Sequence, residues 1–181
     1  MTIDPAVPVP QWGLSAAGRE RAAAVAGEPW VRRLAAVFAS TERKAVETAE
    51  LLAAVTGLDV VTDHELGEND RSATGFLPPA EFEQVADRFF ANPHDSVRGW
   101  ERAIDAQRRM VAAVGRCLDA APAGDVVIVA HGAVGTLLRC HLLDIPIDRR
   151  HDQPGVGSGY VVDRATRTVR TPWERLPAGW T

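Results

Sequence analysis

Polar and apolar positions along the chain predict two kinds of segment. Residues 97–121 place apolar side chains at helical spacing, which predicts a long helix with one buried face. Residues 126–130 form an apolar run without a polar face, typical of a strand covered on both sides in a parallel sheet. The predicted helices cover residues 16–26, 43–56, 78–90, 97–121 and 132–143, and the predicted strands cover residues 37–40, 59–62, 126–130, 159–162 and 168–171.

Turn and cap residues separate these segments. Ser15 is a suitable N-cap for the first helix, and Gly57 stands where a helix C-terminus favours glycine. Gly, Asn, Asp and Ser recur through residues 63–77, which we therefore expect to form a loop. Because helices and strands alternate, we expect an α/β fold: one three-layer domain over residues 1–181, with a largely parallel sheet and helices on both faces.

Composition narrows the class of protein. The chain of 181 residues fits one domain, 46% of it is apolar, and its formal net charge is −4 without any Lys/Arg run. This balance argues against a nucleic-acid partner, which needs a clustered basic surface. The N-terminus lacks the features of a signal peptide, no apolar run approaches a membrane span, and two cysteines make no disulfide framework. We therefore expect a cytoplasmic protein with no membrane partner.

Three polar motifs follow predicted strands, at the edge where open α/β sheets bind their ligands. The first, Ala130-His131-Gly132, lies between the apolar strand and a helix. Gly132 permits a ligand to approach the backbone closely, and the helix N-terminus offers free N–H groups to an anion. A hydrogen-bonded core histidine is an equally good interpretation of this tripeptide taken alone.

The other two motifs carry charge. Ser40, Arg43 and Lys44 come where a strand enters a helix, and a cation there would hold phosphate oxygens. An ordinary polar helix start is the alternative. Glu68 follows in Leu66-Gly67-Glu68, ahead of a glycine-bearing loop. A carboxylic acid beside a bound phosphate is favoured in its protonated form and can protonate a leaving oxygen.

In this order, the motifs resemble those of the histidine phosphatase superfamily, which includes phosphoglycerate mutases and small phosphatases. Residues 12–18 are similar to its W-x-L-S-x-x-G segment, and residues 40–49 to its S-x-x-x-R-A-x-x-T-A helix start. Residues 66–68 fit its acid segment, and residues 130–132 its late S-H-G motif. The resemblance extends over residues 12–143 and implies a phosphoglycerate mutase-like fold.

The resemblance also implies a phosphomonoester phosphatase that works through a phosphohistidine, without a metal or organic cofactor. In the family, a histidine in an Arg-His-Gly motif at the end of the first strand attacks phosphorus, and water then releases phosphate. By motif match, Glu68 is the acid for the leaving group and His131 is the second, phosphate-binding histidine. The other phosphate-binding candidates are Ser40, Arg43, Lys44 and Gly132. The implied partner is a phosphorylated small molecule or a phosphoprotein.

Two departures from the family pattern affect this interpretation. The family's arginine falls on Lys44, and we favour Lys44 over Arg43 at the phosphate because one residue turns a helical side chain by about 100°. The first strand and its nucleophilic histidine are absent: no histidine precedes His64, and nothing before Trp12 suits a buried strand. We therefore hypothesise that the start of the chain was assigned too late.

Other functions remain open. The four other histidines are expected to be structural or exposed; they are His64, His94, His141 and His151. A non-catalytic relative that binds a phosphorylated ligand or partner is the second hypothesis, and an α/β domain without a ligand is the third. Residues 75–95 carry four phenylalanines and few basic residues where the family covers its pocket, which argues against a highly charged substrate.

Overall fold

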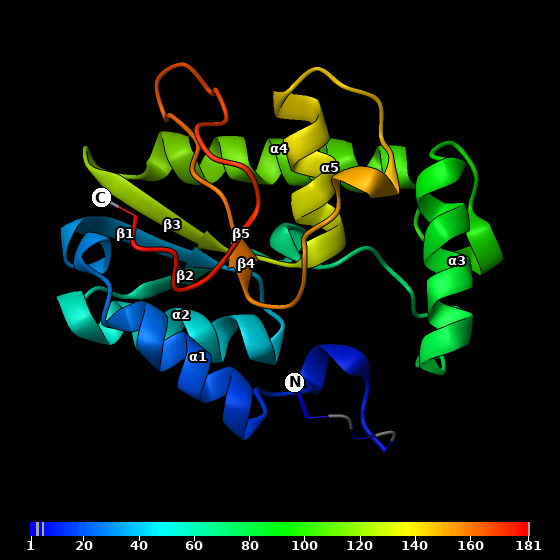
Figure 1. Cartoon of the computed structure of the whole chain (residues 1–181), viewed down its shortest axis with the longest axis horizontal. Helices are drawn as coiled ribbons and strands as arrows, with labels where there is room; N and C mark the ends of the chain where they lie inside the picture. Colours follow the sequence, from blue (N-terminus) through cyan, green and yellow to red (C-terminus); the bar gives the residue numbers. More distant parts are fainter. Residues whose placement is uncertain (3, 5, 181) are drawn as a thin grey trace.

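A parallel sheet of three strands forms the centre of the molecule. The computed structural model describes residues 1–180 except residues 3 and 5. The strands lie in the order β2 (Val60–Thr62), β1 (Leu34–Ala39) and β3 (Asp125–Val129) (Figure 1). Because both pairings are parallel, the carboxyl ends of all three strands lie at one edge of the sheet.

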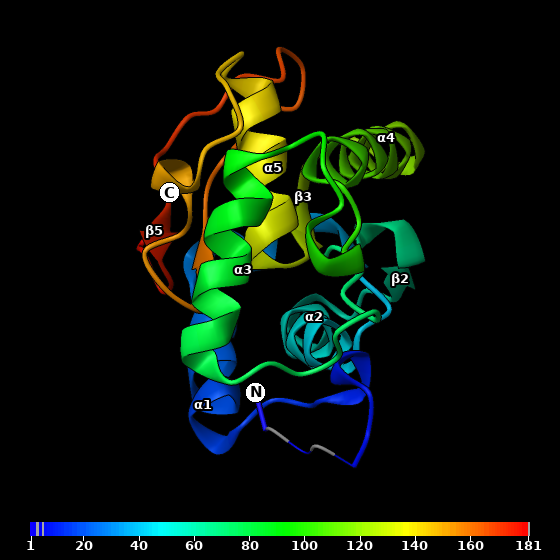
Figure 2. The same ribbon diagram turned by 90° about the vertical axis from the view of Figure 1, so that its right-hand side faces the viewer.

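Helices cover both faces of this sheet, which confirms the three-layer α/β fold (Figures 1 and 2). The helices are α1 (Ala16–Ala26), α2 (Arg43–Thr56), α3 (Pro79–Ala91), α4 (Ala103–Ala120) and α5 (Gly132–Leu142). Helices α1 and α2 lie on one face, and α4 and α5 on the other. Successive β1 side chains enter opposite cores, since Val37 packs on the side of α1 and α2 and Phe38 packs on the side of α4 and α5.

Local sequence explains several helix ends. The Ser15 Oγ accepts the N–H of Gly18 at 3.2 Å and caps α1, and Gly57 ends α2 with a left-handed φ of 70°. Both caps confirm the prediction. Short 3-10 turns occupy Val9–Gln11, Pro29–Arg33, His64–Leu66, Val97–Gly99 and Arg149–His151. Within the described part of the chain, no helix has the length and apolar character needed to cross a bilayer.

The long helix predicted over residues 97–121 is shorter than expected. It begins at Ala103, because Arg98 and Gly99 adopt left-handed φ angles of 54° and 81° that an α-helix cannot continue. Trp100 is nevertheless buried, and its indole N–H donates to the Thr74 hydroxyl at 2.9 Å. The apolar spacing therefore predicted burial correctly but placed the helix start too early.

The C-terminal strands also differ from the prediction. Residues 159–162 and 168–171 meet only in an isolated antiparallel bridge between Val162 and Val169. The named strands of this region pair β4 (Ser158–Gly159) with β5 (Glu174–Arg175) instead. Such short segments carry too little apolar alternation to specify a partner, so their tertiary position decides the pairing.

Strand β3 is less covered than its apolar run predicts. Residues 126–130 are all half-buried, whereas Val37 and Ala39 of β1 are fully buried. The reason is its place in the sheet: among the residues that the structure describes, β3 pairs with β1 on one edge and with no strand on the other. An apolar edge strand of this kind offers free backbone groups to a further strand.

Candidate active site

Two of the predicted residues meet at the carboxyl edge of the sheet. Ser40 follows β1 and His131 follows the end of β3, and these strands are neighbours. The Ser40 Oγ lies 2.8 Å from the His131 Nε2. The Ser40 Oγ also accepts the N–H of Glu42 at 3.0 Å. Ser40 is fully buried and the His131 side chain is 5% exposed, which holds both in place.

Glu68 joins them from the loop after the His64–Leu66 turn. Its carboxylate accepts the N–H groups of Ala133 and Val134, at 3.4 and 3.2 Å, in the first turn of α5. An acidic side chain is stabilised at a helix N-terminus by free N–H groups and by the helix dipole. Arg109 of α4 fixes the loop, since its guanidinium donates to the carbonyl of Gly67 at 3.1 Å and to that of Glu68 at 3.4 Å.

Lys44 reaches this group of residues through Glu42. Its ammonium forms an ion pair with the Glu42 carboxylate, whose Oε1 lies 3.3 Å from the His131 Nε2. The same Oε1 accepts the N–H of Glu68 at 2.9 Å. Glu42 is 8% exposed, so this is a buried carboxylate that links all three motifs. Sequence reasoning missed it, because an acidic residue just before a helix normally signals only a favourable helix start.

The buried surroundings perturb two ionisable groups. Burial lowers the pKa of His131, and the negative charges of Glu68 and Glu42 offset this only in part. Burial acts to raise the pKa of Glu42, but His131 in its protonated form and the hydrogen bond and charge of Lys44 bring this pKa below its ordinary value. We therefore expect a neutral imidazole beside an ionised Glu42 at neutral pH.

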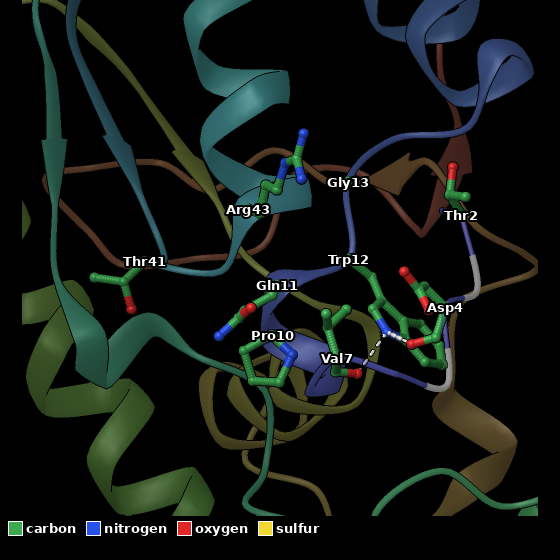
Figure 3. Close-up of a pocket in the computed structure, with 9 residues that line it drawn as sticks. All are labelled: Thr2, Asp4, Val7, Pro10, Gln11, Trp12, Gly13, Thr41 and Arg43. Atoms are coloured by element: carbon green, nitrogen blue, oxygen red, sulfur yellow. Dashed lines mark hydrogen bonds between the residues drawn. The ribbon is translucent and has the colours of Figure 1, made fainter.

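Arg43 points away from these residues. Its guanidinium donates to the Glu47 carboxylate at 2.8 Å, and its side chain is 66% exposed. It lines a separate surface cavity of ≈470 Å³ with Trp12 and other residues of the N-terminal segment (Figure 3). Thr41, the residue after Ser40, also lines this cavity, whereas Ser40 and His131 are not among its lining residues.

Gly132 stands where a larger residue would collide with its neighbour. A Cβ at this position would lie 2.1 Å from the Gln153 Nε2, so the amide of Gln153 packs directly against the glycine backbone. The adjacent Asp152 is engaged elsewhere, because its Oδ1 accepts the Thr136 hydroxyl at 2.9 Å.

Among the described residues, no three His, Cys, Asp or Glu side chains are grouped so as to hold a metal ion.

Arg71 is a cation near the site that sequence reasoning did not single out. Its guanidinium lies 5.2 Å from the ring centroid of Phe82 and 5.6 Å from that of Trp100. Its charge contributes to lowering the pKa of His131, after the larger effect of burial. No pattern in the sequence links these residues, because the fold alone brings two aromatic rings to this loop.

The phenylalanines of residues 75–95 do not all face a pocket. Phe89 and Phe90 are 1% and 2% exposed and belong to the core on the side of α4 and α5. The amphipathic helix α3 turns them inward, which corrects the expectation that they cover a binding site. Phe76 is exposed and lies beside Trp12, with ring centroids 5.6 Å apart.

Solved structures of similar fold span most of the chain. Bacillus stearothermophilus YhfR is 28% identical, with a TM-score of 0.73 over 91% of this chain and 85% of that chain. A mycobacterial glucosyl-3-phosphoglycerate phosphatase in complex with inorganic phosphate is 23% identical, with a TM-score of 0.69 over 92% and 87% of the two chains. The Shigella flexneri α-ribazole phosphatase is 18% identical, with a TM-score of 0.66 over 91% and 86%.

The family model agrees with these structural likenesses. No curated protein matched in the sequence comparison. The model of the histidine phosphatase superfamily (branch 1), however, matches residues 9–168, which include Ser40, Lys44, Glu68 and His131. The chain therefore belongs to the histidine phosphatase superfamily.

Proposed function

We propose that this protein hydrolyses phosphomonoesters through a phosphohistidine, with an attacking histidine supplied from outside residues 1–181. The observation that carries the proposal is the convergence of Ser40, His131 and Glu68 at one edge of the sheet. Family membership supports phosphatase chemistry. Shielded donors and cations around a reacting phosphate are the main source of catalysis in such a reaction.

Each group has a role in this proposal. His131, Lys44 and the N–H groups at the start of α5, once Glu68 releases them, hold the phosphate oxygens. Gly132 lets the phosphate approach the backbone after the Gln153 amide moves aside. Glu68 gives a proton to the leaving oxygen of the substrate. For this, its carboxyl group has to exchange its present N–H donors, Ala133 and Val134, for the substrate.

The edge of β3 that pairs with no described strand is an argument for a nucleophilic histidine from outside residues 1–181. None of the other four histidines makes a described contact with His131, and the side chain of His64 is 84% exposed. A parallel strand added beside β3 would end at the same edge as His131, because parallel strands share a direction. The half-buried apolar side chains of residues 126–130 suit such a neighbour.

The substrate class follows from the relatives and from the charges of the site. Similar structures include phosphatases named for glucosyl-3-phosphoglycerate and α-ribazole, which supports a phosphorylated small molecule over a phosphoprotein. We propose a substrate with a single phosphate group, because Glu42 and Glu68 offset the charges of Lys44 and Arg71 near His131.

The first experiment is the intact mass of the protein made by its own organism. A mass above 19.5 kDa, with a histidine in the added residues, is the expected result. In that longer chain, His131→Ala and Glu68→Gln should each lower kcat/KM for an aryl phosphate by roughly 100-fold. His141→Ala, an exposed residue of the same helix α5, serves as the control. Rates that stay unchanged in both site variants contradict the assigned roles.

A binding role is the second candidate. Lys44 stands where the family has an arginine, and a lysine cannot make a two-pronged contact with phosphate. Phosphate affinity without turnover, in a chain that begins upstream, would favour this binding module over the enzyme.

A further inference from the structure

Glu42 places a negative charge inside the site proposed to bind phosphate. Its carboxylate takes three partners that an incoming phosphate oxygen would also use: the Lys44 ammonium, the His131 imidazole and the N–H of Glu68. These partners come from three separate segments, so the carboxylate sits where they converge. Glu42 is 8% exposed, so water does not screen its carboxylate. An anion that enters the site must therefore compete with this carboxylate for the same three partners.

A second carboxylate, that of Glu68, occupies the N-terminus of α5 in a similar way. The first N–H groups of α5 already bind the Glu68 carboxylate, so two carboxylates of the protein satisfy the groups that would hold phosphate. The charged groups facing one another here are Lys44 and Arg71, which are positive, and Glu42 and Glu68, which are negative. With a neutral His131, these charges cancel, and a dianion gains little net attraction.

We infer that Glu42 is a specificity-determining residue: it acts as an internal anion between Lys44 and His131, which a phosphate group must displace or neutralise by bringing a proton. The inference rests on the proposed function, because it concerns the same site. It predicts that anion binding is coupled to proton uptake, either by Glu42 or by His131. It also predicts a preference for monoanionic phosphate groups over dianionic ones.

Two groups of the site can take up the proton when an anion binds, His131 and Glu42. Burial and the positive charges of Lys44 and Arg71 keep the imidazole neutral, whereas Glu42 and Glu68 favour its protonated form. A bound anion adds negative charge beside His131 and shifts this balance toward the imidazolium. If the anion instead displaces Glu42, the carboxylate loses Lys44 and its pKa rises, so that it takes up the proton.

The test is calorimetric titration of the 181-residue chain with inorganic phosphate and with sulfate at pH 7.5. Proton uptake is measured from how the binding heat changes between buffers of different ionisation enthalpy. Sulfate carries no titratable proton near this pH, so any proton taken up on sulfate binding goes to the protein. The variant Glu42→Gln keeps the shape and the hydrogen-bonding oxygen but removes the charge. Glu47→Gln is the matched control, since Glu47 lies one turn further along α2 and pairs with the outward-facing Arg43.

The expected result is about tenfold tighter binding of both anions by Glu42→Gln, with reduced proton uptake, and unchanged affinity in Glu47→Gln. If the unmodified chain binds phosphate and Glu42→Gln binds it equally or more weakly, the role of Glu42 is wrong and the proposed function stands. If neither protein binds an anion, the inference about Glu42 fails, whereas the proposed function is decided by the rates of the longer chain. Should Glu42→Gln not fold, the unmodified chain decides alone, because sulfate binding without proton uptake overturns the inference.

Discussion

At the scale of single residues, two adjacent arginines of α4 illustrate how burial decides their contribution. The Arg109 side chain is 21% exposed, and its guanidinium donates to the Glu101 carboxylate at 2.8 Å and to carbonyls of the loop that carries Glu68. The neighbouring Arg108 is 72% exposed and lies 3.7 Å from Asp105. Its ion pair is weak because solvent screens it. Arg109 thus positions the proposed acid without touching the substrate.

We expect Arg109→Leu to destabilise the protein by about 2–4 kcal/mol, because it leaves the Glu101 carboxylate and loop carbonyls without their donor. It should also weaken phosphate binding by loosening Glu68. Urea unfolding and calorimetric titration measure the two effects. Arg108→Leu, one position away, should change the free energy of unfolding by less than about 0.5 kcal/mol. Equal effects in the two variants would show that Arg109 has no special anchoring role.

At the scale of elements, two glycines mark the difference between the loop before α4 and the helix itself. Gly99 has a φ of 81°, and a Cβ there would lie 2.8 Å from the Cβ of Ala73. Gly115 lies inside α4, where an added Cβ would meet nothing within 4 Å. The left-handed backbone at Gly99 is what ends the helical pattern on the N-terminal side of Ala103.

Alanine at these two positions should therefore have opposite effects on the free energy of unfolding. Gly115→Ala should stabilise the protein by up to about 1 kcal/mol, the difference in helix propensity between the two residues. Gly99→Ala should destabilise it by about 1–2 kcal/mol, because alanine is strained at this φ and collides with Ala73. Thermal and urea unfolding measure both values, and a stabilising Gly99→Ala would contradict the assigned helix start.

At the scale of the whole molecule, the free energy of unfolding should decrease over two separate pH intervals as the pH is lowered. The folded state lowers the pKa of His131 below its ordinary 6.5, mainly by burial, so unfolding is accompanied by proton uptake once the pH falls below about 6.5. Among the acids, the pKa values of Glu42 and Asp63 are also lowered, despite burial, by their positive partners. Their stabilisation persists above the unfolded pKa and is lost as the pH falls through the folded values, below about 4.

We expect the free energy of unfolding to decrease from pH 7 to pH 5 by up to about 1.4 kcal/mol per pH unit for the one imidazole, and to decrease further below pH 4. His131→Gln should flatten the first interval and leave the second unchanged. Urea unfolding at a series of pH values gives these slopes, and an unaltered first interval in His131→Gln would mean that another group titrates there.

Much of the fold and half of the candidate site follow from local patterns. The bounds of α1 and α2 match the predicted ranges, because the alanine-rich run after Ser15 and the cap residue Gly57 are local signals. Ser40, Glu68 and His131 follow from motif order, and parallel pairing then brings Ser40 and His131 together. Local patterns misplaced the start of α4, because a left-handed turn at Arg98 and Gly99 leaves the burial of Trp100 unchanged.

The amino-acid sequence by itself determined the α/β class, the helix caps and the candidate residues for phosphate chemistry, because each depends on neighbours along the chain. Only the tertiary structure decided that Glu42 lies buried between Lys44 and His131, and that β3 has no second neighbour among the described strands. The physical reason is that burial, ion pairing and strand order depend on contacts between distant segments. The periodicity of apolar residues along the chain does not predict those contacts.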